Sequence, residues 1–144
     1  MLLMTWGYAK GDSGNPSIFP DYLTMQSLLE TGYREMAHAV AVAGHAVKIA
    51  PAGLAFRAIY QREVTLGHDP LGSQSLFLQL YGPDFIHPAV PGTYLAACVV
   101  TATIHGVDPT TFTGTVAGID PATTLLLQTA ARDVVAAENA RPPP

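Results

Sequence analysis

The sequence predicts an α/β fold, because two short segments of strand character flank one long stretch of helical periodicity. Residues 2–4 form an apolar run that indicates a buried strand, and residues 46–51 form a second segment that ends at Pro51. Strand, helix and strand in this order are typical of a parallel βαβ unit. A chain of 144 residues can build one such domain but not two comfortably. We therefore expect a single domain over residues 1–139 and a disordered tail over residues 140–144.

The longest predicted helix begins after Asp21, whose side chain can accept hydrogen bonds from the free N–H groups of the first turn. Gly44 is placed to end this helix, and the glycine- and proline-rich residues 9–20 before it are expected to form a loop. Within the helix, apolar residues recur three or four positions apart, which predicts one buried stripe. The stripe consists of Tyr22, Met25, Leu29, Tyr33, Met36 and Val40.

Further helices are predicted downstream, giving about four in all. One covers residues 52–63, one begins after His87 and ends at Gly106, and the last follows Asp120, which caps it and precedes a proline. Residues 76–80 can form either a short strand or a helical turn, and their length does not decide between them.

The composition excludes several classes of protein. Only 12% of the residues are charged and 49% are hydrophobic, which excludes disorder for most of the chain. The net charge is -4 and there is no run of Lys or Arg, so we expect no nucleic-acid partner. The single cysteine, Cys98, allows no internal disulfide and no cysteine-rich zinc site. The sequence has no secretory signal pattern and no apolar run long enough for a bilayer, so no membrane partner is expected and the compartment stays unknown.

Asp84 and His87 lie three residues apart in a turn-rich segment that leads into an apolar helix. A histidine that acts as a general base needs one ring nitrogen free and the other donating to an orienting acceptor. A carboxylate three residues earlier in a loop can provide that acceptor without help from the rest of the fold. The same spacing also fits an aspartate that caps a turn beside a partly exposed histidine, and the spacing alone leaves both interpretations open.

The residues around this pair carry a resemblance to a known group of enzymes. The segment "LYGPDFIHPAVPGTYLAACVVTATIHGVDP" (residues 80–109) resembles the C-terminal block of the SGNH (GDSL-type) hydrolase superfamily, in which Asp-x-x-His is followed by proline and by a helix that starts Gly-Thr-Tyr-Leu. Phe85-Ile86 stands where that block usually has a small pair containing glycine. Residues 4–37, with Met-Thr-Trp-Gly, an acidic glycine-rich loop and Phe-Pro-Asp, resemble the strand–loop–helix segment of one branch of the superfamily.

The resemblance implies a partial flavodoxin-like, three-layer α/β/α sheet that carries a Ser-His-Asp esterase site. His87 would take the proton of the serine and later return it to the leaving alcohol, while Asp84 would hold the ring in one tautomer. The substrate would be a small-molecule ester, of an acyl group or of a carbohydrate. No cofactor and no metal are implied.

In this superfamily the serine lies in a Gly-Asp-Ser-like turn after the first strand, and Gly11-Asp12-Ser13 has the same letters. Because this region already matches a later segment of the superfamily, we interpret Ser13 as a loop residue. The chain is then expected to be the C-terminal portion of a hydrolase domain, weak or inactive as an esterase alone. Its first strand would present an open sheet edge, which predicts self-association or a partner chain. Two alternatives stay open: a small intact esterase that uses Ser13, and a non-catalytic α/β module for binding or assembly.

Overall fold

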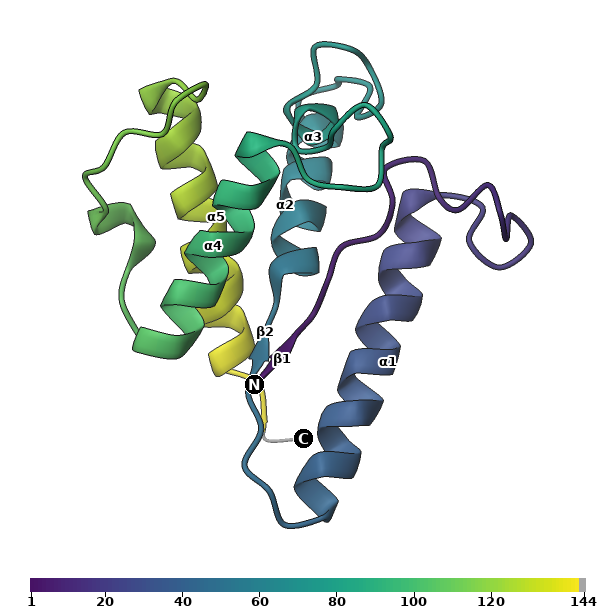
Figure 1. Cartoon of the computed structure of the whole chain (residues 1–144), viewed down its shortest axis with the longest axis vertical. Helices are drawn as coiled ribbons and strands as arrows, with labels where there is room; N and C mark the ends of the chain where they lie inside the picture. The colour runs from purple at the N-terminus through teal and green to yellow at the C-terminus, as the bar shows by residue number, and fades with distance from the viewer. Residues whose placement is uncertain (143–144) are drawn as a thin grey trace.

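A two-stranded parallel sheet lies at the centre of a mostly helical chain in the computed structural model, which describes residues 1–142 (Figure 1). The predicted α/β class is confirmed at this level. Five α-helices are present in the described residues, one more than predicted, because residues 76–79 form a helical turn and not a strand. In chain order the elements are β1 (Leu2–Leu3), α1 (Tyr22–Val42), β2 (Ile49–Ala50), α2 (Ala52–Thr65), α3 (Leu76–Gln79), α4 (Val90–His105), the 3-10 helix η1 (Pro109–Thr111) and α5 (Pro121–Asn139).

Of the tail predicted for residues 140–144, positions 143 and 144 lie outside the described residues. No helix in the described part of the chain combines the length and the apolar character needed to cross a bilayer.

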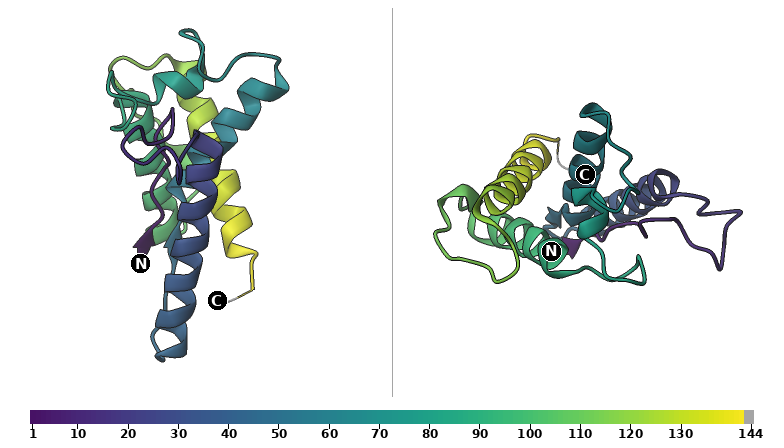
Figure 2. Two further views of the ribbon diagram at one scale, coloured as in Figure 1. Left: turned by 90° about the vertical axis from the view of Figure 1, so that its right-hand side faces the viewer. Right: turned by 90° about the horizontal axis from the view of Figure 1, so that it is seen from above.

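The two strands pair in parallel because α1 carries the chain back between them. Leu2 lies opposite Ile49 and Leu3 opposite Ala50. The N–H of Leu2 donates to the carbonyl of Lys48 at 2.8 Å, and the N–H of Met4 donates to Ala50 at 2.9 Å. The loops that follow β1, α2 and α3 gather at one end of the molecule, beyond the carboxyl ends of the strands (Figures 1 and 2). Loops at this end of parallel strands commonly carry the functional residues of α/β proteins.

The predicted helix caps are present. The Asp21 carboxylate accepts the Thr24 N–H at 2.8 Å, and the Asp120 carboxylate accepts the N–H groups of the residues that follow Pro121 at 2.9 and 3.0 Å. Gly106 ends α4 with a φ of 67°, a left-handed conformation that glycine adopts without steric cost. Local sequence signals therefore account for where these helices begin and end.

The buried stripe predicted for α1 is only partly correct. Tyr22 and Met25 are buried, but Met36 is 50% exposed, and Ala37 is the buried residue of that turn. The cause is the small sheet, because two strands of two residues each offer too narrow a surface to cover the whole apolar side of a 21-residue helix. Part of that side is left open to solvent.

A network of ion pairs connects α1 to the end of α5 and to α2. The Arg34 guanidinium donates to both carboxylate oxygens of Glu138 at 3.0 Å, and it also contacts Glu30 at 2.8 Å. Arg57 of α2 contacts the second oxygen of Glu30 at 2.9 Å. These side chains are between 12% and 33% exposed, so solvent screens the pairs only in part.

The core combines apolar residues of α2, α3, α4 and α5 with Tyr22 of α1 and Ala50 of β2, and an aromatic cluster lies at the end nearest the loops. Phe56 is at its centre, with Trp6 stacked on it at 4.9 Å between ring centroids and Tyr81 edge-on at 5.4 Å. Phe77 packs edge-on against Tyr22 at 4.6 Å. Such pairs add stability beyond the area that they bury, so this cluster holds the loop end of the domain rigid.

Gly92 lies in the first turn of α4. Because it has no side chain, α4 approaches the end of α3 more closely than it could with any other residue at this position. A Cβ atom at Gly92 would overlap the carbonyl oxygen of Leu80 and lie 3.1 Å from the ring of Phe56. The glycine of the Gly-Thr-Tyr-Leu motif is therefore required by packing.

Gly92→Ala is expected to lower the free energy of unfolding by about 1–3 kcal/mol, because either α4 or Leu80 must shift to make room. Gly32→Ala is the matched control, since a Cβ atom there meets nothing within 4 Å. That variant should be more stable than the parent by about 0.5–1 kcal/mol through helix propensity alone. Chemical denaturation followed by circular dichroism measures both, and equal effects of the two substitutions would contradict the packing argument.

Candidate functional site

Residues 81–89, between α3 and α4, form a loop whose two ends are hydrogen-bonded to each other. The N–H of Gly82 donates to the carbonyl of His87 at 2.8 Å, and the N–H of Ala89 donates to Leu80, also at 2.8 Å. A tight turn closes the tip, where the Phe85 N–H donates to Gly82 at 3.0 Å. The loop therefore has a defined conformation even though most of its side chains are accessible.

Within this loop, Asp84 holds the imidazole of His87. The Nδ1 atom of His87 lies 2.6 Å from Oδ2 of Asp84. An ionised carboxylate only accepts hydrogen bonds, so Nδ1 carries the proton and donates it. In the neutral ring, the other nitrogen, Nε2, then carries the free lone pair that a general base needs. The contact expected from the three-residue spacing is present.

The second carboxylate oxygen of Asp84 accepts two backbone N–H groups, those of Ile86 and His87, both at 3.0 Å. The hydrogen bond from the His87 ring, followed by these two backbone bonds, lowers the pKa of Asp84 from 3.8 to about 2. Asp84 is therefore ionised throughout the physiological range. The aspartate caps the turn and orients the histidine at the same time, so the two interpretations of the spacing are compatible.

The imidazole lies at the surface. The His87 side chain is 80% exposed and the Asp84 side chain 45% exposed, so the free nitrogen faces solvent and not an enclosed cleft. A surface position allows a reacting group to approach Nε2 from outside, whether it comes with a substrate or from another part of a protein.

Phe85, between the two residues, has a φ of +61°. A residue with a Cβ atom pays a steric cost in this left-handed region, where glycine does not. Phe85 is one of the two residues that stand where the resembled block usually has a small pair containing glycine. Its positive φ is the conformation in which glycine would be favoured. Two contacts hold Phe85 in place: its carbonyl accepts the Ala9 N–H at 2.9 Å, and the Lys10 ammonium lies 3.6 Å above its ring.

The segment after β1 supports the loop at two further points. The indole N–H of Trp6 donates to the carbonyl of Ile86 at 3.2 Å, and the hydroxyl of Tyr81 donates to the carbonyl of Gly7 at 2.7 Å. Residues 6–10 and 81–87 therefore position each other. Sequence reasoning did not connect these segments, because they are 74 and 80 positions apart at the bonded pairs and neither carries a pattern that pairs it with the other.

Ser13 lies apart from the dyad in the structure. It is an exposed residue of a turn in which the Asp12 carboxylate accepts the Gly14 N–H at 2.8 Å and the side-chain amide of Asn15 at 2.9 Å. The loop that contains this turn projects away from the body of the molecule next to the start of α1 (Figure 1). Among the hydrogen bonds of residues 1–142, none joins Ser13 to His87. Ser13 is therefore a loop residue, as predicted, and the view that it is not the nucleophile stays a prediction.

A second carboxylate–histidine contact occurs at the end of α2. The Nδ1 atom of His68 lies 3.0 Å from Glu63, whose side chain is only 3% exposed and also accepts a hydrogen bond from Arg62 at 2.9 Å. Sequence reasoning missed this pair because nothing in the sequence shows that Glu63 is buried. Within residues 1–142, no group of three or more potential metal ligands comes together.

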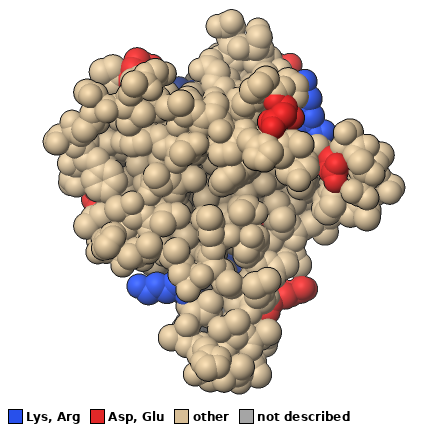
Figure 3. All heavy atoms as spheres, viewed as in Figure 1, with Lys and Arg blue, Asp and Glu red and all other residues tan. Residues whose placement is uncertain are grey.

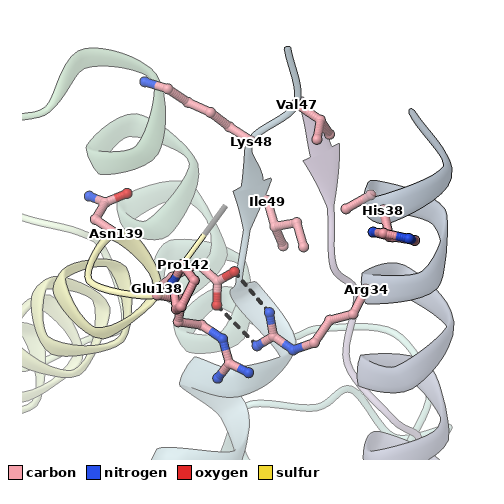
Figure 4. Close-up of a pocket in the computed structure, with 10 residues that line it drawn as sticks. Arg34, His38, Val47, Lys48, Ile49, Glu138, Asn139 and Pro142 are labelled. Carbon is pink, nitrogen blue, oxygen red and sulfur yellow. Dashed lines mark hydrogen bonds and ion pairs between the residues drawn. The ribbon is translucent and has the colours of Figure 1, made fainter. Parts of the chain in front are cut away.

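A cavity of about 530 Å³ lies at the other end of the sheet, between α1, the start of β2 and the end of α5 (Figure 4). Arg34 and Glu138 meet across it, Ile49 and His38 face each other from β2 and α1, and Lys48 points away from it (Figure 4). Neither Asp84 nor His87 lines this cavity, so it is separate from the dyad.

No protein-family model and no curated protein matches the sequence. The fold is similar to that of a crystal structure of a DUF4886 family protein from Bacteroides uniformis, with a TM-score of 0.75 and 20% sequence identity. The match covers 99% of this chain and 50% of that chain, so this chain spans half the length of the solved protein. At this identity the likeness establishes a shared fold and nothing about chemistry.

The pKa of Asp84 is expected near 2 in a carbon-detected NMR titration of its carboxyl group. His87→Ala should move it up toward 3.8, because the largest cause of the shift is removed while the two backbone bonds stay. The contribution of the ionised carboxylate to stability is fully present above about pH 4 and is lost as the pH falls through about 2. His45→Ala, which removes an exposed histidine elsewhere, should leave the titration unchanged. A midpoint of 3.8 in the parent protein would show that the contact does not form in solution.

Replacing Phe85 tests the strain in the loop. Phe85→Gly should be more stable than Phe85→Ala by about 1 kcal/mol, because both lose the ring and only glycine adopts the left-handed φ without cost. The comparison cancels the loss of the Lys10 contact, which both variants share. Urea unfolding curves measure the difference, and an alanine variant as stable as the glycine variant would contradict the backbone conformation described.

Proposed function

We propose that this chain carries the acid–base pair of a serine ester hydrolase of the SGNH type. The observation that supports the proposal most is the 2.6 Å contact between Nδ1 of His87 and Asp84, on an exposed ring whose Nε2 has no hydrogen-bond partner within residues 1–142. A histidine with one nitrogen bonded to an ionised carboxylate and the other free is the arrangement that general-base catalysis requires. The resemblance of residues 80–109 to the Asp-x-x-His block points to the same chemistry.

In the proposed reaction, Nε2 of His87 accepts the proton of a serine hydroxyl as its oxygen attacks the ester carbonyl. The imidazolium then donates that proton to the departing alcohol oxygen, and a water molecule deprotonated by the same nitrogen releases the acid. Asp84 keeps Nδ1 protonated throughout and offsets the positive charge that forms on the ring. The substrates would be small esters of acyl or carbohydrate groups, with no cofactor or metal.

The proposal includes the finer architecture, a partial flavodoxin-like sheet with helices on both faces. Two observations support it: β1 and β2 are parallel with α1 between them, and the same fold occurs in a solved protein of twice the length. The chain would then be the C-terminal portion of a larger hydrolase domain, with the serine in a block upstream of the matched segments. Alone it would be a weak esterase or an inactive one.

A non-catalytic role in binding or assembly is the second candidate. It is favoured by one observation, that within residues 1–142 no hydroxyl group is hydrogen-bonded to the ring of His87. The third possibility, a small intact esterase, needs the loop that carries Ser13 to move toward His87.

Hydrolysis of p-nitrophenyl acetate tests the reactivity of the Nε2 lone pair, because an imidazole attacks this activated ester directly, without a serine. His87→Ala should reduce the rate of hydrolysis above the buffer background by about tenfold or more. Asp84→Asn should reduce this rate too, because the ring proton is no longer held on Nδ1. His45→Ala is the control for an exposed histidine without a carboxylate partner and should change little. If His87→Ala behaves like His45→Ala, Asp84 does not enhance the reactivity of Nε2 and the non-catalytic candidate is favoured.

A fluorophosphonate probe separates the remaining alternatives, because it reacts only with an activated serine. We expect no labelling of this chain. Labelling that Ser13→Ala abolishes and His87→Ala also abolishes would establish the intact esterase and overturn the view that the serine lies elsewhere.

A further inference from the structure

The peptide group between Ile86 and His87 has a hydrogen-bond partner on each side. Its N–H, which belongs to His87, donates to Oδ1 of Asp84 at 3.0 Å. Its carbonyl, which belongs to Ile86, accepts the indole N–H of Trp6 at 3.2 Å, and no other donor reaches this carbonyl within residues 1–142. Because both bonds share one planar peptide group, the indole fixes the direction in which the N–H meets the carboxylate.

The series of hydrogen bonds continues to the imidazole. Oδ2 of the same carboxylate accepts the Nδ1–H of His87 at 2.6 Å. Indole, peptide group, carboxylate and imidazole are therefore connected without a break, and groups connected in this way polarise one another. After the bond from the ring, the bonds from the Ile86 and His87 N–H groups are the next causes of the lowered pKa of Asp84. A change at the indole is thus transmitted to the group that holds the ring proton.

The indole is itself fixed from two sides. Its ring stacks on the fully buried Phe56, with 4.9 Å between the centroids and 13° between the planes. The next residue, Gly7, donates its N–H to the buried side chain of Gln26 at 2.8 Å, and its carbonyl accepts the Tyr81 hydroxyl at 2.7 Å. A phenylalanine at position 6 would provide the same stacking, so packing alone does not account for the N–H that meets the loop.

Ion pairs contribute little to the position of this loop. Apart from the contact between Asp84 and His87 itself, no ion pair of residues 1–142 involves residues 81–89. The middle of the face on which β1 is seen has almost no Lys, Arg, Asp or Glu side chains (Figure 3). The loop is therefore positioned by hydrogen bonds and aromatic contacts, and Trp6 provides one of each.

We infer that Trp6 is a positioning residue for the acid–base pair, acting through the Ile86–His87 peptide group to keep the ring proton on Nδ1. The neutral ring can carry its proton on either nitrogen, and only the form with Nδ1–H leaves Nε2 free. Without the indole donor, the peptide group is free to rotate and Asp84 holds that form less firmly. The consequence for ester hydrolysis rests on the proposed function, whereas the effect on the ring does not.

Replacement of Trp6 by benzothienylalanine tests the inference, because a sulfur atom takes the place of the indole N–H while the ring keeps its shape. Trp6 is the only tryptophan of the chain, so incorporation of the analogue changes this one position. NMR of the ring nitrogens of His87, at a pH where the ring is neutral, measures the ratio of the Nδ1–H form to the Nε2–H form. A net hydrogen bond shifts an equilibrium by about two- to tenfold, and we expect the ratio to fall by about this factor. Fluorotryptophan, which keeps the N–H, is the matched control and should leave the ratio unchanged.

Trp6→Phe is the genetically encoded counterpart, since it keeps an aromatic ring on Phe56 and removes the donor. Its control is Tyr60→Phe, which removes a hydroxyl from the same aromatic cluster, where Tyr60 packs against Tyr22 and Phe77. Urea unfolding establishes that the compared proteins are folded. In the unmodified protein the indole N–H should be protected from hydrogen exchange, and an indole that exchanges freely overturns the inference without any substitution.

The rate of p-nitrophenyl acetate hydrolysis above the buffer background should fall together with the tautomer ratio. A ratio that both replacements of Trp6 leave unchanged overturns the inference, because Trp6 would then only pack. A slower hydrolysis with an unchanged ratio overturns it as well, since the effect would not pass through the ring of His87. A lowered ratio in a protein that shows no hydrolysis above background supports the positioning role and contradicts the proposed function.

Discussion

The position of the Asp84–His87 loop depends on how closely α4 approaches the end of α3. The carbonyl of Leu80 accepts the Ala89 N–H and lies where a side chain at Gly92 would begin. The hydrogen bond from Ala89 to Leu80 closes the loop at its base, and the absence of a side chain at Gly92 lets the first turn of α4 pack against Phe56. Without that approach, Asp84 and His87 would still be neighbours in sequence, but the turn that carries them would have no fixed relation to the sheet.

A second constraint acts on the tip of the loop. The strained backbone of Phe85 is held by Ala9 and Lys10, and the carbonyl of Ile86 is held by the Trp6 indole. The stacking of Trp6 on Phe56 anchors this support in the aromatic cluster. The loop thus receives its conformation from residues that follow the first strand, while its two polar side chains remain open to solvent. This combination of a rigid backbone and accessible side chains suits a reactive group.

The sequence predicts those parts of the structure that depend on local chemistry. Asp21 and Asp120 cap helices, Gly106 ends one, and the Asp84–His87 contact needs only a three-residue turn. The sequence does not predict features that depend on the size of the sheet or on contacts between distant segments. Met36 is exposed because too few strands cover α1, although its periodicity matches that of buried residues.

The same limit applies to the candidate site. The bond from Trp6 to Ile86 spans 80 positions, and the burial of Glu63 beside His68 follows from packing that no local pattern records. The Phe85 backbone is a different case. The residue type argues against a left-handed conformation, and only the tertiary contacts with Ala9 and Lys10 explain why it occurs.

The bridge from Arg34 to Glu138 joins residues 104 positions apart and connects the first long helix to the last turn of the final one. α1 is held by its buried residues Tyr22, Met25 and Ala37, and the guanidinium adds a direct link from the middle of this helix to the last turn of α5. Fraying or proteolytic trimming of the carboxyl-terminal turn would therefore be transmitted to the amino-terminal half, and α1 would loosen before the central core opens. Resistance of α1 to digestion is thus raised by an intact carboxyl-terminal turn, by about the 0–1 kcal/mol that a partly exposed ion pair contributes.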